Sequence, residues 1–103
     1  MNKRAYSLDE LLQGLAAGRV VPVDEEDWAA WAAGFTVVAT VGSTLGGDKR
    51  IVRWPVPGSR RRGWGLVEEP EPGLLAVRPV RDAREARALI AERLAAYERM
   101  WDG

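Results

Sequence analysis

Short connections between apolar runs are the feature of this chain that most restricts its fold. The runs are rich in β-branched or aromatic residues: Phe35 to Val41, Arg50 to Val56, Trp64 to Glu68 and Leu74 to Val80. The segments between them are short and rich in glycine and proline. Neighbouring runs are therefore predicted to pair as antiparallel hairpins, which gives a β-meander of three or four strands within residues 35–80.

Two segments within residues 1–34 have helical patterns. Ser7 and Glu10 form an S-x-x-E capping box in front of a stripe of leucines, which predicts the start of a first helix. Asp24 is a candidate N-cap for a second helix. Between the two helices, Arg19 to Val23 fits either an edge strand or an extended linker, because a proline interrupts its apolar run.

Residues 82–101 form the longest predicted element, and Asp82 is placed to cap its start. Apolar side chains recur there at three- and four-residue steps, as in an amphipathic helix: Ala86, Leu89, Ile90, Leu94, Tyr97 and Trp101. The predicted fold class is therefore α+β, with two N-terminal helices, a three- to four-stranded antiparallel β-meander and a long C-terminal amphipathic helix packed on one sheet face. We expect a single domain over residues 1–103, with a helical part (1–34), the meander (35–80) and the C-terminal helix.

The composition excludes several kinds of chemistry. The chain has no cysteine and no histidine, so it lacks thiolate and imidazole metal ligands, a nucleophilic cysteine and a histidine acid or base. The glycine spacing at 42–47 is followed by a strand pattern rather than a helix, unlike a phosphate-binding loop. Helix capping explains the acidic run 24–27, and Glu69 and Glu71 alternate with prolines in a predicted exposed turn. We expect a protein that is not an enzyme and that uses no cofactor and no metal ion.

Charge and hydropathy bear on the compartment. The 15 basic and 15 acidic residues give a net charge of zero, which weighs against a dedicated nucleic-acid binder. The first ten residues lack the apolar core of a signal peptide, and no apolar run approaches the roughly 18–20 residues of a membrane span. We expect a cytoplasmic protein with no membrane partner. Its arginine-rich charge fits either a thermophile or a GC-rich genome.

One segment departs from the composition of an ordinary small domain. Its basic residues have no acid among them: Lys49, Arg50, Arg53, Arg60, Arg61 and Arg62. Trp54 and Trp64 bracket the densest part, which is predicted to be a hairpin. Arginine side chains bind phosphates and carboxylates, and indoles stack on bases or on guanidinium groups. The candidate binding residues are therefore Arg53, Trp54, Arg60, Arg61, Arg62 and Trp64.

The partner of this hairpin is left open among several classes. We favour a small binding or regulatory module that acts through a protein–protein interface, including self-association, because the acidic clusters 24–27 and 68–71 could meet the hairpin across a symmetric interface. They could also meet it within one chain. The alternatives are nucleic-acid binding through Arg60 to Arg62, an enzyme of unrecognised class, and a solvated turn without a partner. No small-molecule ligand is indicated.

Overall fold

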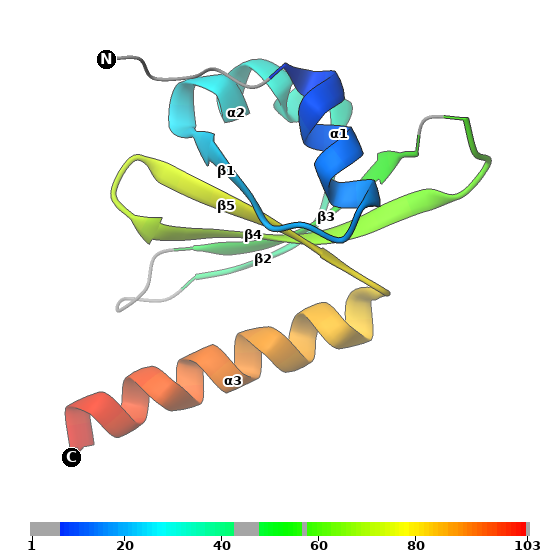
Figure 1. The fold of residues 1–103 in the computed structure, drawn as a ribbon. Helices are drawn as coiled ribbons and strands as arrows, with labels where there is room; N and C mark the ends of the chain where they lie inside the picture. Colours follow the sequence, from blue (N-terminus) through cyan, green and yellow to red (C-terminus); the bar gives the residue numbers. More distant parts are fainter. Residues whose placement is uncertain (1–6, 43–47, 57, 103) are drawn as a thin grey trace.

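The computed structural model describes residues 7–42, 48–56 and 58–102, apart from the side chains of 97 and 100–102. The described residues contain helices, strands and one 3₁₀ turn (Figure 1). In chain order these are α1 (Leu8–Ala16), β1 (Val21–Asp24), α2 (Glu25–Trp31), the 3₁₀ turn η1 (Ala32–Gly34), β2 (Thr36–Val41), β3 (Lys49–Pro55), β4 (Arg62–Glu71), β5 (Leu74–Val80) and α3 (Ala83–Asp102).

The strands form one antiparallel sheet in the order β1-β5-β4-β3-β2. β2 to β5 pair consecutively, which confirms the predicted α+β class and its meander. The sheet also has a fifth strand, which lies outside the predicted meander of three or four strands. This strand, β1, joins the sheet beside β5, with Val21 opposite Val77 and Asp24 opposite Leu74. Of the two interpretations of Arg19 to Val23, the edge strand is the one observed, so residues 1–34 are not wholly helical.

Helices cover both faces of this sheet. α1 and α2 lie over one face, and α3 crosses the other, as predicted for the C-terminal helix (Figure 1). Alternation along β3 supplies both layers: Val52 and Trp54 join the cluster under α1 and α2, whereas Ile51 joins Ile90 of α3 in a second cluster. Burial of apolar side chains on both faces is the main force that holds the three layers together.

The N-terminal helices begin where the sequence predicts. The hydroxyl of Ser7 accepts a hydrogen bond from the backbone N–H of Glu10 at 3.1 Å, and the Glu10 carboxylate accepts one from the N–H of Ser7 at 3.1 Å. The predicted capping box is thus complete. Asp24 occupies the N-cap position of α2, although its carboxylate makes no capping hydrogen bond.

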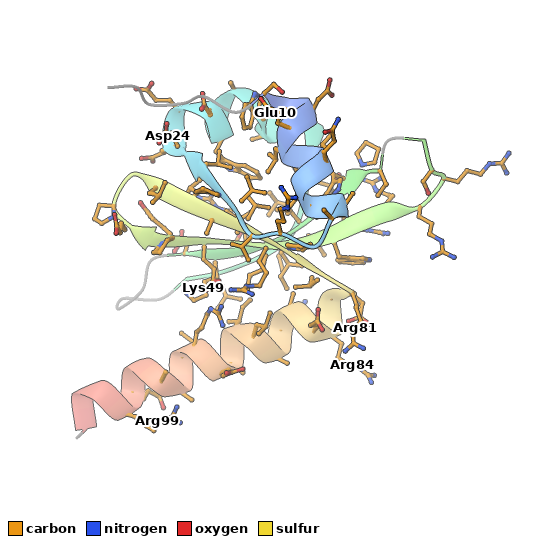
Figure 2. All side chains as sticks on the ribbon, in the orientation of Figure 1. Glu10, Asp24, Lys49, Arg81, Arg84 and Arg99 are labelled. Carbon is orange, nitrogen blue, oxygen red and sulfur yellow. The ribbon has the colours of Figure 1, made fainter. Side chains whose placement is uncertain are left out.

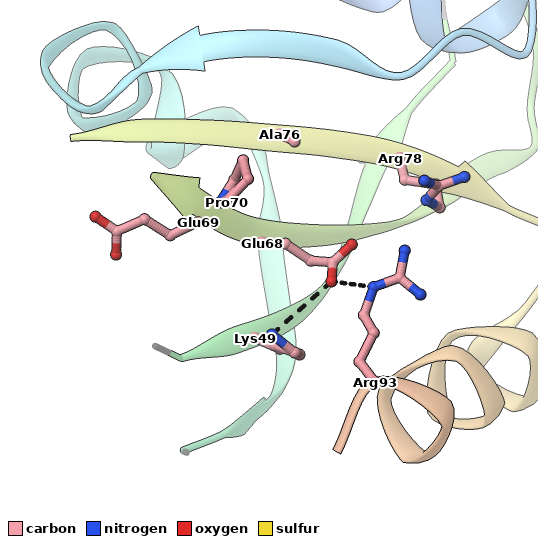
Figure 3. Close-up of a pocket in the computed structure, with 7 residues that line it drawn as sticks. All are labelled: Lys49, Glu68, Glu69, Pro70, Ala76, Arg78 and Arg93. Carbon is pink, nitrogen blue, oxygen red and sulfur yellow. Dashed lines mark ion pairs between the residues drawn. The ribbon is translucent and has the colours of Figure 1, made fainter. Parts of the chain in front are cut away.

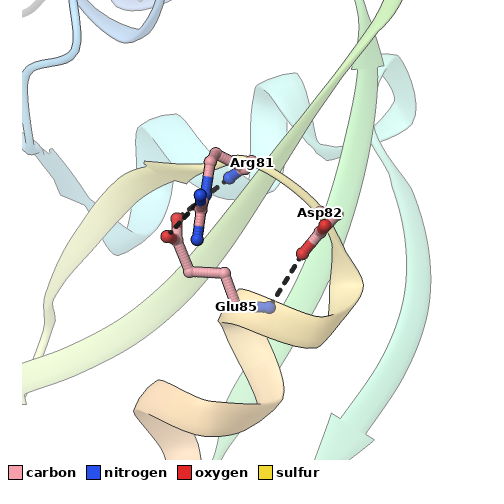
Figure 4. Close-up of polar contacts among 3 residues, drawn as sticks. All are labelled: Arg81, Asp82 and Glu85. Carbon is pink, nitrogen blue, oxygen red and sulfur yellow. Dashed lines mark hydrogen bonds and ion pairs between the residues drawn. The ribbon is translucent and has the colours of Figure 1, made fainter.

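A compact set of polar contacts fixes the start of α3 (Figure 4). Asp82 Oδ1 accepts a hydrogen bond from the backbone N–H of Glu85 at 2.9 Å, which confirms the predicted cap. The Glu85 carboxylate accepts hydrogen bonds from the backbone N–H of Arg81 at 3.0 Å and from its Nε at 3.1 Å. These contacts set the point at which α3 leaves β5, and hence which of its residues face the sheet.

Candidate functional site

The basic hairpin between β3 and β4 projects beyond the rest of the sheet (Figure 1). Arg60 and Arg61 are exposed at its tip, where the backbone N–H of Arg61 donates to the hydroxyl of Ser59 at 3.0 Å. Arg62 is also exposed, but its Nη2 donates to the hydroxyl of Thr36 at 2.9 Å and so ties the hairpin base to the start of β2. The two arginines at the tip are therefore the ones that face solvent without a described contact of their guanidinium groups.

Arg53 and Trp64 form a stacked pair at the base of the hairpin. They lie opposite each other on β3 and β4, on the sheet face that α3 crosses, with the guanidinium carbon 4.2 Å from the indole ring centre. The Nε of Arg53 is inaccessible to solvent and has no hydrogen-bond partner among the described residues. The pair is a half-buried cation–π contact, which stabilises the hairpin base by about 0.5–1 kcal/mol.

Trp54 does not belong to this surface, and its inclusion among the candidate residues is corrected. Only 4% of its surface is exposed, and it faces α1 and α2 rather than α3. Its ring lies 5.6 Å from that of Phe35 and packs against the backbone of Gly63 and Gly65. The cause is strand alternation: adjacent residues on β3 point to opposite faces, so Arg53 and Trp54 cannot share one.

The arginines of the hairpin tip and the acidic clusters lie at opposite ends of the sheet. Arg62 begins β4 and Glu71 ends it, and ten strand residues span about 30 Å. The acidic run that starts at Asp24 lies at the Glu71 end, because Asp24 and Glu71 both pair with Leu74. The N–H of Glu25 also donates to the carbonyl of Gly73 in that β4–β5 turn. The acidic run and the β4–β5 turn are therefore held away from the hairpin tip, whereas Lys49, at the other end of the basic segment, lies beside Glu68 of the cluster 68–71 within the same chain.

β2 presents a free sheet edge. It is the outermost strand beside β3, and its six residues include no charge and no proline. Val37 and Val38 are 48% and 45% exposed. A register shift between Val37 and Ala39 makes Val38 a bulged residue. The helices pack chiefly on the other strands, so none of the described residues covers the outer edge of β2.

A cavity of about 280 Å³ opens on the α3 face of the sheet (Figure 3). Lys49 of β3, Arg78 of β5 and Arg93 of α3 line it, together with Glu68 of β4. Lys49 is only 2% exposed, and its Nζ lies 3.8 Å from Oε2 of Glu68. Arg93 forms an ion pair with the same carboxylate oxygen. Lys49 of the predicted basic segment and Glu68 of the acidic cluster 68–71 therefore both belong to the wall of this cavity.

The other polar groups of the cavity increase its positive charge. Arg78 has a solvent-inaccessible Nε that finds no hydrogen-bond partner among the described residues. Glu69 also lines the cavity, but its carboxylate turns away from Lys49 (Figure 3) and accepts a hydrogen bond from the N–H of Gly73 at 3.0 Å. Three cationic side chains therefore face a single inward-pointing carboxylate.

Sequence reasoning missed both the β2 edge and this cavity. Alternation along β3 places Lys49 and Arg53 on the same face as Ile51, which was the available signal for an inward-facing Lys49. The approach of Arg78 and Arg93 depends on strand order and on the path of α3, which no local pattern encodes.

Within the described parts of the chain, no group of three or more acidic side chains is arranged to hold a metal ion. Each described helix is too short or too polar to cross a lipid bilayer. Comparisons with protein-family models, with curated proteins and with solved structures found no match.

Proposed function

We propose that this chain is a non-enzymatic protein-binding module that associates with a second copy of itself through the edge of β2. The uncovered edge carries the proposal. A strand edge presents unpaired N–H and C=O groups, and natural proteins usually protect such edges with charges, prolines, β-bulges or a covering element. Thr36–Val41 has no charge and no proline, and it adds two exposed valines. These features favour pairing with another strand, which would extend the sheet across two chains.

The symmetry of β2 pairing favours a second copy as the occupant. β2 runs from Thr36, beside Arg53 and Arg62, to Val41, beside Lys49. A two-fold axis between two β2 strands pairs them antiparallel, so that the Thr36 end of one strand lies beside the Val41 end of the other. The same pairing brings Arg62 of one chain toward Asp48 of the partner, which lies beside the Val41 end of the partner's β2. Because β2 itself is uncharged, this pairing sets no like charges opposite each other.

The bulge makes such pairing selective. Val38 interrupts the regular ladder of β2, so an incoming strand must match a break in its hydrogen-bonding pattern. A second β2 carries the same bulge and is self-complementary about a two-fold axis. Indiscriminate strands lack this match, which limits aggregation at the edge.

Sedimentation equilibrium tests the proposal directly. The wild-type chain is expected to show a concentration-dependent dimer. Val38→Lys is expected to weaken it at least about 10-fold, because two-fold symmetry sets two like charges near each other and the edge becomes charged. Val20→Lys is the matched control, since Val20 is a similarly exposed valine (43%) outside β2 and its replacement should leave the dimer intact. A wild-type monomer at every concentration would refute the proposal, as would equal weakening by both substitutions.

The exposed hairpin tip supports nucleic-acid binding as a second candidate. Arg60 and Arg61 face solvent at the end of the sheet away from Glu71 and the acidic run, so neither cluster neutralises them. Their binding to a mixed-sequence single-stranded oligonucleotide should weaken with salt, with a log–log slope of about 0.7 per phosphate contact. Arg60→Ala with Arg61→Ala should flatten that slope. Absence of binding at low salt would end this candidate.

A further inference from the structure

We propose that the cavity between the sheet and α3 binds a small ligand through a phosphate group that it carries. The inference does not depend on the proposed dimer, because the cavity lies on a sheet face and the dimer uses the β2 edge. Lys49, Arg78 and Arg93 line the cavity together with Glu68, and the second lining carboxylate, that of Glu69, turns away, so the lining cations outnumber the acids. A phosphate group carries the opposite charge.

The burial of these groups strengthens their attraction for an anion. Lys49 is 2% exposed, the Arg93 side chain is 26% exposed and Glu68 is 14% exposed, so water screens their charges poorly. Glu68 holds Arg93 against the sheet. The guanidinium group of Arg78 lines the same cavity, so an anion there would lie near the charges of Lys49, Arg78 and Arg93 together.

The donor set and the size of the cavity define the ligand class. Guanidinium groups present paired N–H donors that match the oxygens of phosphate, and a lysine adds a compact charge. A volume of about 280 Å³ is near the lower end of the range for small-molecule pockets, roughly 300 Å³. The ligand is therefore a phosphate on a body of a few atoms. Its non-phosphate part would lie toward the apolar side chains of Pro70 and Ala76.

Isothermal titration with inorganic phosphate tests this site, with ionic strength held constant by sodium chloride. The wild-type chain is expected to bind one phosphate saturably, and its melting temperature should rise over the same concentration range. Arg78→Met is expected to weaken binding about 10- to 100-fold, the range for loss of a hydrogen bond to a charged group. Arg84→Met is the matched control, because it removes the same charge from an exposed position of α3 outside the cavity and should leave the affinity unchanged.

A second variant and a second anion keep the test decisive. Arg93→Met should weaken phosphate binding as Arg78→Met does. It replaces Arg78→Met as the test if that variant does not fold, because Arg93 lies at a partly exposed helix position where truncation is better tolerated. Malonate at equal ionic strength should bind more weakly than phosphate. The proposal is overturned if phosphate gives no saturable signal beyond that of chloride, if Arg84→Met weakens binding as much as Arg78→Met, or if malonate binds and phosphate does not.

Discussion

Replacement of Gly63 by alanine should destabilise the chain although alanine is the better strand residue. Gly63 lies on β4 opposite Trp54 of β3, and the indole covers its backbone. A Cβ atom at Gly63 would stand 2.5 Å from Nε1 and 2.6 Å from Cζ2 of that indole, closer than such atoms approach. The ring cannot swing outward, because Trp54 is only 4% exposed and packs against Phe35. The strain must therefore be taken up by the core.

The expected loss follows from two opposing effects. Overpacking of a filled core costs about 1–3 kcal/mol. Alanine regains about 0.5–1 kcal/mol over glycine in a strand, since it loses less backbone freedom on folding. Because the new Cβ clashes directly with a fixed ring, the overpacking cost of Gly63→Ala should lie near the upper end of its range. We therefore expect a net loss of about 2 kcal/mol in the free energy of unfolding. For a domain of this size that lowers the melting temperature by about 8–16 °C.

Urea denaturation measures this loss, with Gly34→Ala as the control. A Cβ at Gly34 meets nothing within 4 Å, so that variant should be as stable as the wild type or slightly more stable. Combining Gly63→Ala with Trp54→Leu should recover at least about 1 kcal/mol relative to the sum of the single changes, because the smaller side chain frees the space. Equal stabilities of the Gly63 and Gly34 variants would show that Trp54 is not packed as described.

Two further changes test the polar contacts. Glu68→Gln should lower the free energy of unfolding by about 2 kcal/mol, because it leaves Lys49 and Arg93 without their shared carboxylate. This loss is smaller than that for removing one partner from a fully buried pair, since the site is partly exposed. Lys49→Met should cost less, since the Glu68–Arg93 pair persists; the reverse order in urea denaturation would contradict this account. Ser7→Ala should lower the free energy of unfolding by about 1 kcal/mol through loss of the capping box with Glu10, and an unchanged urea midpoint would argue against that cap.

Local patterns predicted the elements whose partners are close in the chain. The meander, the capping box of α1, the Asp82 cap of α3 and the apolar stripe of α3 follow from spacing over a few residues. β1 was left open for a physical reason. Its partner is β5, with Val21 opposite Val77, and a four-residue strand that contains Pro22 has too little local signal to identify a partner so far along the chain.

The candidate site was predicted less well because burial depends on which face a residue takes. Trp54 was grouped with the arginines by proximity in the chain, yet alternation along β3 already placed it opposite Arg53. Lys49 was grouped with the basic segment without a prediction of its burial, which follows from the position of Glu68 on β4 and the path of α3 above both. Register and helix position decide such cases, and neither is encoded in charge density.

Salt concentration can distinguish dimerisation through the β2 edge from nucleic-acid binding by the hairpin tip, because different forces would drive the two interactions. Pairing through Thr36–Val41 relies on backbone hydrogen bonds and apolar contacts of an uncharged strand, so it should persist as salt rises. Phosphate contacts by Arg60 and Arg61 would each contribute about 0.7 to the salt slope, so a tenfold rise in salt should weaken oligonucleotide binding about 25-fold. The hairpin tip projects past the end of β2 (Figures 1 and 2), which leaves both surfaces reachable at once. A dimer that remains at a salt concentration where the oligonucleotide complex is lost would therefore assign the strand edge and the hairpin tip to different partners.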